Sequence, residues 1–158
     1  MATKKKATKV AKKATAKKTA RKPAAKTAKR SPKTSSTKAT STAKPLGPYT
    51  PVVRAGDWII VSGQLGIADG KVVAGGVAAQ TTKAIENLKG QLASVGASLS
   101  DVSKTLCFLT DMDTFASFNT AYVAGFGNAR PARSTIGVAS LPFGGAVEIE
   151  AWAHKPLR

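Results

Sequence analysis

The pattern of apolar and polar residues begins with two short runs suited to β-strands. The stretch PVVRAGDWIIVSGQL, residues 51–65, is rich in Val and Ile and is broken at Ala55-Gly56-Asp57. Runs of this kind, separated by a turn that contains Gly, predict an antiparallel hairpin. The IADGK sequence that follows predicts a second turn, and Val72-Val73 after it predicts a short extra strand.

The apolar period then changes from two residues to three or four, which predicts an amphipathic helix over residues 77–95. Gly96 follows the last apolar position, where helices commonly end in a glycine. Such a helix would turn one apolar face toward a sheet. The residues on that face are Val77, Thr81, Ala84, Ile85, Leu88, Leu92 and Val95.

The second half of the chain repeats the change from strand to helix. KTLCFLT, residues 104–110, predicts a short buried strand, and Asp111 or Asp113 is a candidate N-cap for a helix. Aromatic residues at helical spacing predict that helix, and residues 131–153 predict a closing hairpin with a Pro/Gly turn. The aromatic positions are Phe115, Phe118, Tyr122 and Phe126.

These elements follow the order ββ-α-β-α-ββ, which predicts a single α+β domain with a mixed sheet and both helices on one face. Residues 1–44 depart from this pattern. They are built almost entirely from Lys, Ala, Thr, Ser and Pro, with 16 Lys or Arg and no acidic residue. We therefore expect a disordered basic tail at 1–44, followed by a folded domain at 45–158.

The tail and the domain differ in charge. The chain carries a formal net charge of +17, whereas residues 45–158 hold 9 basic and 8 acidic residues. The tail's charge favours sequence-independent contact with nucleic acid, and its composition resembles that of linker-histone tails. A solvated spacer and a mitochondrial transit peptide are the rival interpretations. Because the tail has few Arg and no apolar face, we expect a cytoplasmic protein, or one associated with the nucleoid.

The single Cys and the single His exclude several kinds of chemistry. With only Cys107 and His154, the chain has no intramolecular disulfide and no zinc site made of Cys and His ligands. Cys107 lies in an apolar run, so we interpret it as an inert core thiol. The sequence has no run of about 20 apolar residues, which a membrane span needs, and no signal-peptide pattern.

Charged residues stand in the otherwise apolar closing segment RPARSTIGVASLPFGGAVEIEAWA, residues 130–153. Strict alternation places Glu148 and Glu150 on the opposite strand face from their apolar neighbours. In one interpretation both glutamates simply face solvent. In the other, their strand pairs with the strand that starts near Arg133, so that a guanidinium and a carboxylate meet at a ligand.

Three stretches together resemble the RidA (YjgF-like) family of reactive-intermediate imine/enamine deaminases. They are GPYTPVVRAGDWIIVSGQLGI, AAQTTKAIENLKGQLASVGASLSDVSKTLCFLTDMDTFASFNTAYVAGFG and PARSTIGVASLPFGGAVEIEAWA, and they occur in family order. The resemblance implies a chorismate-mutase-like α+β fold and a homotrimer with active sites at its interfaces. It further implies hydrolysis of small imino or enamino acids such as 2-aminoacrylate to 2-keto acids and ammonia, with no metal, cofactor or membrane involved.

The resemblance also implies roles for particular residues. Arg133 of PARS would bind the substrate carboxylate, and Glu148 of EIE would position the attacking water. The substrate-binding candidates are Tyr49, Ser62, Gly63, Asn119 and Thr135.

Each of these candidates has a plainer interpretation. Tyr49 suits packing, and Ser62 and Gly63 suit backbone geometry. Asn119, in the middle of a predicted helix, suits a solvent-facing position. Thr135 stands where some family members have a cysteine and others do not, so it does not argue against activity.

The alternative function is a trimeric ligand-binding or nucleic-acid-associated platform without deaminase activity. Some relatives are described as ribonucleases or translation inhibitors, which makes RNA cleavage a further hypothesis. A pure platform has no need of both Arg133 and Glu148, so this pair favours the deaminase. The basic tail favours an added contact with nucleic acid.

Overall fold

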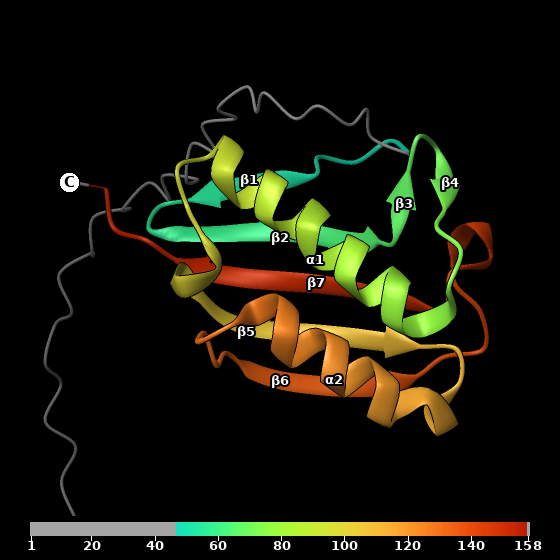
Figure 1. The fold of residues 1–158 in the computed structure, drawn as a ribbon. Coiled ribbons are helices and arrows are strands. Elements are labelled where there is room, and N and C mark those ends of the chain that lie inside the picture. The colour runs from blue at the N-terminus through green and yellow to red at the C-terminus, as the bar shows by residue number, and fades with distance from the viewer. Residues whose placement is uncertain (1–46, 158) are drawn as a thin grey trace, which may run out of the picture. The chain divides into compact units, whose positions relative to one another are not determined.

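The computed structural model describes residues 47–157, which form a five-stranded sheet, a two-stranded hairpin and two α-helices (Figure 1). The strand order in the larger sheet is β1-β2-β7-β5-β6. The predicted tail lies outside the described residues. The strands are β1 Val52–Ala55, β2 Trp58–Leu65, β3 Ile67–Ala68, β4 Lys71–Val72, β5 Val102–Leu109, β6 Ala132–Gly137 and β7 Val147–His154; the helices are α1 Gly76–Ser94 and α2 Phe115–Phe126.

Both predicted turns in the first part of the domain are confirmed. Strands β1 and β2 form an antiparallel hairpin in which Ala55 pairs with Trp58. The IADGK sequence turns between β3 and β4, a small hairpin whose second strand, Lys71–Val72, includes Val72 but not Val73 of the predicted extra strand. Asp69 and Gly70 both have positive φ in this turn, a conformation that Asp and Gly tolerate better than most residues.

Helices α1 and α2 lie side by side on one face of the sheet, as predicted (Figure 1). The apolar face of α1 is buried, and Gly96 follows the helix with φ of +74°. Val95 ends the helix as its C-cap. The α1 residues that the sequence predicted for the core and that the structure buries are Val77, Thr81, Ala84, Ile85, Leu88 and Leu92.

Helix α2 is entered through a short 3₁₀ turn, Met112–Thr114. The Asp111 carboxylate accepts a hydrogen bond from the Asp113 backbone N–H, so Asp111 caps this turn and not α2 itself. Phe118, Tyr122 and Phe126 are buried against the sheet, and Phe115 remains 37% exposed. The mixed α+β fold is therefore the one that the sequence predicted.

The predicted closing hairpin is wrong. Strand β6 pairs parallel with β5, and β7 lies between β2 and β5, antiparallel to both. Parallel neighbours need a crossover, which α2 supplies between β5 and β6. The Pro/Gly signal is a 3₁₀ turn, Pro142–Gly144, within a longer connection that returns the chain to the centre of the sheet. The local turn signal was correct, but the strand pairing inferred from it was not.

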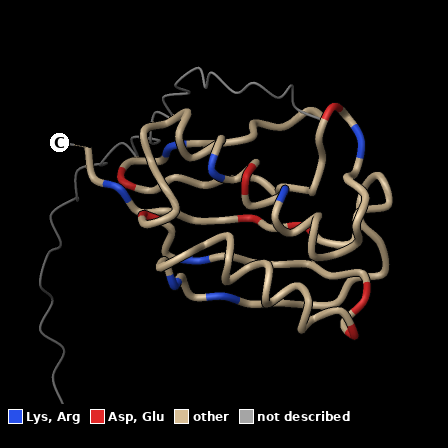
Figure 2. The backbone as a smooth tube through the Cα atoms, in the orientation of Figure 1, with Lys and Arg blue, Asp and Glu red and all other residues tan. Residues whose placement is uncertain are grey.

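Charged positions of both signs are spread over the described residues (Figure 2). Acidic positions lie along the central strand β7, and basic positions lie on the adjacent strand β5 and on the edge strand β6. Within residues 47–157, neither helix is long and apolar enough to cross a membrane.

Candidate functional site

Arg133 lies on the helix-covered side of the sheet, at the edge strand β6. It pairs in register with Thr105 of β5, whose buried hydroxyl is hydrogen-bonded to the Tyr122 hydroxyl of α2 at 2.8 Å. The Arg133 Nη2 donates a hydrogen bond to Oδ1 of Asn119 at 2.9 Å. Paired residues of parallel strands share a face, so Arg133 extends beneath α2 from the edge of the sheet.

Three aromatic rings of α2 surround the Arg133 guanidinium. Its Cζ lies 4.6 Å from the ring centroid of Tyr122, 5.4 Å from that of Phe118 and 5.7 Å from that of Phe115. The ion pairs found within residues 47–157 are Lys83–Glu86 and Lys155–Asp101. Within that part of the chain, Arg133 is thus a partly buried cation without a carboxylate partner.

Thr135 and Cys107 lie near Arg133. Thr135 is on the same strand, β6, and Cys107 is on the neighbouring strand, β5. Thr135 follows two residues after Arg133 on β6 and pairs in register with Cys107 of β5. Cys107 is fully buried, and this burial raises the pKa of its thiol to about 11 despite a hydrogen bond to Thr105. The thiol is therefore protonated near neutral pH, which confirms the interpretation of Cys107 as an inert core residue.

Glu148 faces the other side of the sheet, which the helices do not cover. On β7 the residues Val147 and Ile149 are fully buried under the helices, so alternation turns Glu148 and Glu150 to the open face. Burial raises the pKa of Glu148, and the nearby charge of Glu150 raises it further. Burial also raises the pKa of Glu150. Even in a single chain, both carboxylates are partly withdrawn from solvent.

Gly63 lies directly against the Glu148 carboxylate. A Cβ atom on residue 63 would lie 1.7 Å from Oε1 of Glu148, which is closer than two non-bonded atoms can approach each other. The register between β2 and β7 shifts between Val61 and Gln64, so Ser62 and Gly63 form a β-bulge. The bulge and the missing side chain together make room for the carboxylate.

The Ser62 hydroxyl holds the segment that carries Tyr49. Its Oγ donates to the Thr50 carbonyl at 2.9 Å, and its backbone N–H donates to the Pro51 carbonyl at 2.9 Å. Tyr49 is 45% exposed, so it is not a core packing residue in the single chain. Ser62 thus has a backbone role, and its bonds tie the two residues that follow Tyr49 to β2.

The sequence-based expectation that Arg133 and Glu148 meet through paired strands is wrong within one chain. Strand β5 separates their strands, and their side chains lie on opposite faces of the sheet. The predicted residues therefore form two groups. The β6–α2 group is Asn119, Arg133 and Thr135; the β2–β7 group is Tyr49, Ser62, Gly63 and Glu148.

Sequence reasoning missed two contributions to these groups. It used the spacing of Phe115, Phe118 and Tyr122 only to predict a helix, and did not connect these residues with Arg133. It also missed Gln80 of α1, which is buried and whose Oε1 accepts the Ala146 backbone N–H at 2.7 Å. This bond fixes the chain just before β7. A buried Gln on an apolar helix face was the available signal.

The open face of the sheet also exposes large apolar side chains. Trp58 and Ile60 of β2 are 46% and 41% exposed, and Ile136 of β6 is 44% exposed. Apolar side chains gathered on one sheet face favour contact with another protein surface.

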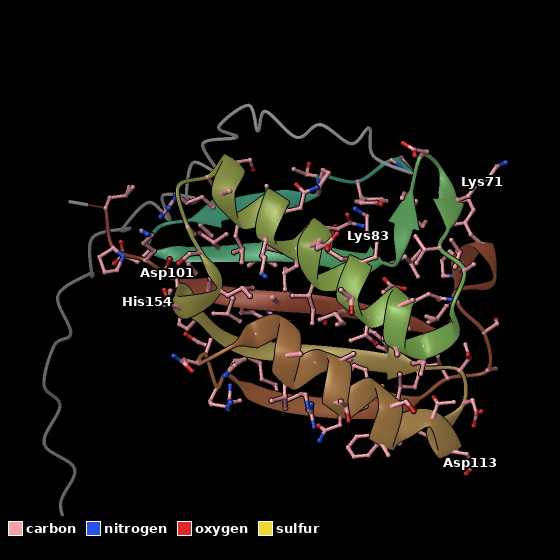
Figure 3. The ribbon with its side chains drawn as sticks, in the orientation of Figure 1. Lys71, Lys83, Asp101, Asp113 and His154 are labelled. Atoms are coloured by element: carbon pink, nitrogen blue, oxygen red, sulfur yellow. The ribbon has the colours of Figure 1, made fainter. Side chains whose placement is uncertain are left out.

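A shallow pocket lies at the far end of β7 and includes none of the predicted residues. Its lining includes Arg54, His154 and the Lys155–Asp101 ion pair. Figure 3 shows His154 and Asp101 together there, across the sheet from Asp113. Arg54 is engaged with backbone carbonyls, including that of Lys155 at 2.9 Å. Within residues 47–157, no cluster of three or more His, Cys, Asp or Glu is placed to hold a metal ion.

Comparison with known proteins accounts for most of the chain. A sequence model described as Endoribonuclease L-PSP matches residues 39–155. The 2-iminobutanoate/2-iminopropanoate deaminase of Mus musculus is 39% identical over 121 residues, which are 75% of this chain and 87% of that protein.

Two Escherichia coli structures share the fold. The YjgF gene product has a TM-score of 0.69 at 38% identity, covering 73% of this chain and 95% of that one. TdcF with bound serine has a TM-score of 0.67 at 34% identity, covering 70% and 91% of the two chains. The sequence match and the shared fold agree, and the chain belongs to the Endoribonuclease L-PSP family, the family of RidA and YjgF.

Proposed function

We propose that the protein hydrolyses reactive imines or enamines such as 2-aminoacrylate to 2-keto acids and ammonia. The observation on which this proposal depends is the state of Arg133, whose guanidinium has an amide partner but no carboxylate partner within residues 47–157. An Arg fork of this kind suits bidentate capture of a small carboxylate. Every 2-imino acid carries such a carboxylate beside its reactive carbon.

Besides a group that binds the substrate carboxylate, the reaction needs a group that activates water, and Glu148 suits this role. An enamine first takes a proton on its β-carbon and becomes the iminium, which is already electrophilic. Water then adds to the iminium carbon while the ionised Glu148 accepts a water proton. That proton passes to the nitrogen of the resulting carbinolamine. As the carbon–nitrogen bond breaks, the hydroxyl proton returns to the Glu148 carboxylate, which gives a keto acid and ammonia. A raised pKa makes Glu148 a better proton acceptor once it is ionised.

The two groups of residues can act on one substrate if they come from neighbouring copies of the chain. Arg133 extends from the edge strand of one copy, and Glu148 lies on the open, apolar face of another. We propose a homotrimer with three such shared sites, in which Trp58 and Ile60 are buried by the contact. Sedimentation of the chain that starts at Pro45 tests this assembly, and a monomer that turns over substrate would contradict it.

The comparisons support the same chemistry. A relative with 39% identity is named as a 2-iminobutanoate/2-iminopropanoate deaminase. The TdcF structure contains serine, a small molecule with an α-carboxylate and a nitrogen on the neighbouring carbon. The imino acids in the first protein's name and the serine bound in the second are small amino-acid-like compounds. An Arg and a Glu on opposite sides of a shared site would suit compounds of this kind.

The direct test is release of ammonia and keto acid from freshly generated 2-aminoacrylate. The full chain should accelerate this release above the spontaneous rate, and Arg133→Ala should reduce it strongly. Circular dichroism and sizing must show that the variant is folded and assembled. Equal rates with and without the protein would reject the deaminase.

A second candidate function is action on nucleic acid. Two observations favour it: the family description names an endoribonuclease, and residues 1–44 hold 16 Lys or Arg without an acidic residue. We propose that the tail adds sequence-independent binding to the deaminase. Incubation of the same preparation with a labelled RNA distinguishes the two functions. Cleavage that survives Arg133→Ala, without any imine turnover, would favour the ribonuclease.

A further inference from the structure

The partly buried guanidinium of Arg133 requires stabilisation from the protein, because burial of a cation away from water is costly. Proteins usually supply a carboxylate for this purpose, and Lys155, just after β7, has such a partner in Asp101, just before β5. Within residues 47–157, the Arg133 side chain instead donates one hydrogen bond, to Asn119, and has three aromatic rings within 6 Å of its Cζ. The rings attract a cation through the negative charge on their faces.

The kind of partner determines which donors of Arg133 stay free. A guanidinium has five N–H donors in one plane, and an internal carboxylate would occupy two of them. Ring faces interact with the cation and accept no conventional hydrogen bond. Within residues 47–157, the side-chain hydrogen bond that Arg133 donates goes to Asn119, which leaves the other donors open to an external carboxylate.

We propose that Phe115, Phe118 and Tyr122 are positioning residues that hold the Arg133 fork toward the substrate carboxylate. This inference depends on the proposed deaminase function. The three rings act through Arg133 and do not themselves touch the reacting atoms. They replace an internal ion pair, and so they keep the fork available for the substrate.

The Tyr122 ring is itself held in place. Its hydroxyl is hydrogen-bonded to Oγ1 of Thr105 at 2.8 Å, and Thr105 pairs with Arg133 across the two strands. Phe118 lies against Tyr122, with ring centroids 5.6 Å apart, and is fully buried. The rings nearest to Arg133 are thus fixed by the same strand that fixes Arg133, which limits the angles available to the fork.

Phe115 offers the cleanest test because it is 37% exposed and contributes least to the core. Fluorination of its ring weakens the negative face stepwise and barely changes its size. Replacement of Phe115 by mono-, di- and trifluorinated phenylalanine should raise KM for 2-aminoacrylate progressively, by about 2- to 5-fold in total, with kcat unchanged. A KM that does not change along the series overturns the inference.

Substitutions at Tyr122 and Phe126 separate positioning from packing. Tyr122→Phe keeps the ring but loses the Thr105 bond that helps to fix it, so KM should rise slightly, by up to about 2-fold. Tyr122→Leu removes the ring and should raise KM.

Phe126 stacks on Tyr122 with centroids 4.4 Å apart and is not among the rings around Arg133. Phe126→Leu is therefore the matched control, expected to lower stability and leave KM unchanged. An equal rise in KM for both Leu variants would show that packing alone matters.

Direct binding of pyruvate, the keto acid formed from 2-aminoacrylate, separates this inference from the deaminase proposal. Calorimetry with the full chain should show that pyruvate affinity falls along the fluorinated series. If the native protein binds pyruvate with this trend and does not hydrolyse 2-aminoacrylate, the positioning role stands and the deaminase is rejected. Turnover without any trend in KM or affinity rejects the positioning role and leaves the deaminase.

Discussion

Gly63 and the carboxylate of Glu148 occupy adjoining space, so that a Cβ atom on residue 63 would lie 1.7 Å from Glu148 Oε1. Contact this close is possible because residue 63 has no side chain and lies in the bulge of β2. The position of the proposed water-activating group is therefore set by a glycine on a neighbouring strand.

Gly63→Ala should displace the Glu148 carboxylate. The new methyl group forces the flexible glutamate side chain to move, while the backbone of residue 63 is not in the left-handed region and accepts alanine. We expect kcat to fall by about 10- to 100-fold, because misplacement of a catalytic group by about 1 Å has effects of that size. Steady-state kinetics on 2-aminoacrylate measure the change.

Gly90→Ala is the matched control. Gly90 lies on the exposed side of α1 with no atom within 4 Å of an added Cβ. Alanine there should stabilise the helix by about 0.5–1 kcal/mol and leave kcat unchanged. Full activity in Gly63→Ala would show that the position of Glu148 does not limit the reaction.

Arg133→Lys tests the planar fork while it keeps the positive charge. Loss of two-point recognition should cost about 1.5–3 kcal/mol, or about 10- to 150-fold in kcat/KM. Arg133→Ala should be worse. Glu148→Gln should lower kcat more than it raises KM, since a water-orienting group acts mainly in the transition state. Native rates in both Arg133 variants would leave the carboxylate anchor without support.

The sequence predicted local elements well because their signals are local. Helix α1 shows a three-to-four-residue period, and the turn at Gly56 separates two β-rich runs. The closing hairpin failed because a turn signal says where the chain bends and not which strands pair. The neighbours of β7 are set by long-range contacts with β2 and β5, which no local pattern encodes.

The same limit explains what the sequence revealed of the site. Alternation correctly placed Glu148 on the face opposite Ile149. The face of Arg133 depends on its pairing with Thr105, which requires the crossover through α2. Tyr122 is both a core residue and a neighbour of Arg133, and one helical spacing serves both purposes. The spacing of the aromatic residues alone therefore could not distinguish the core role of Tyr122 from its contact with Arg133.

The pH dependence should reflect the raised pKa of Glu148. Because its pKa lies above the ordinary value of 4.5, the carboxylate stays protonated to a higher pH, and the acidic limb of kcat/KM should lie above pH 4.5. The charge of Glu150 contributes to this rise. Glu150→Gln should therefore move the limb to lower pH, which a pH–rate profile measures. A limb that stays in place would show that the two carboxylates are not coupled.

Stability should depend on pH through the same group. A folded-state pKa above the unfolded value stabilises at low pH, and this contribution is lost as pH rises through the folded pKa. Glu148→Gln should thus be more stable than the native chain at pH 7, and the difference should vanish below about pH 4. Urea unfolding at both pH values measures it, and a difference independent of pH would contradict the assignment.

Deletion of residues 1–44 tests the role of the tail. The full chain should bind DNA or RNA at low salt, and log K should fall with log salt by about 0.9 for each phosphate contact on duplex DNA. The truncated chain, with 9 basic and 8 acidic residues, should lose this binding and keep its deaminase rate. Fluorescence anisotropy across a salt series measures it. Equal affinity in the truncated chain would identify the domain as the binder.

Mixed assemblies of two inactive variants test whether the site is shared between copies. Arg133→Ala removes one half of the site and Glu148→Gln the other, and in a single chain these halves lie on opposite faces of the sheet. If each site takes Arg133 from one copy and Glu148 from its neighbour, random mixing restores both groups in about one quarter of the sites of a cyclic trimer. Denaturing the two variants together and refolding them should therefore recover about a quarter of the native rate, whereas each variant refolded alone should stay inactive.

The double variant Arg133→Ala/Glu148→Gln mixed with native chain provides the matched control, because it also forms mixed trimers and should give a comparable fraction of native sites. Recovery in this control without recovery in the two-variant mixture would place both residues of each site in one copy, and would reject the shared site.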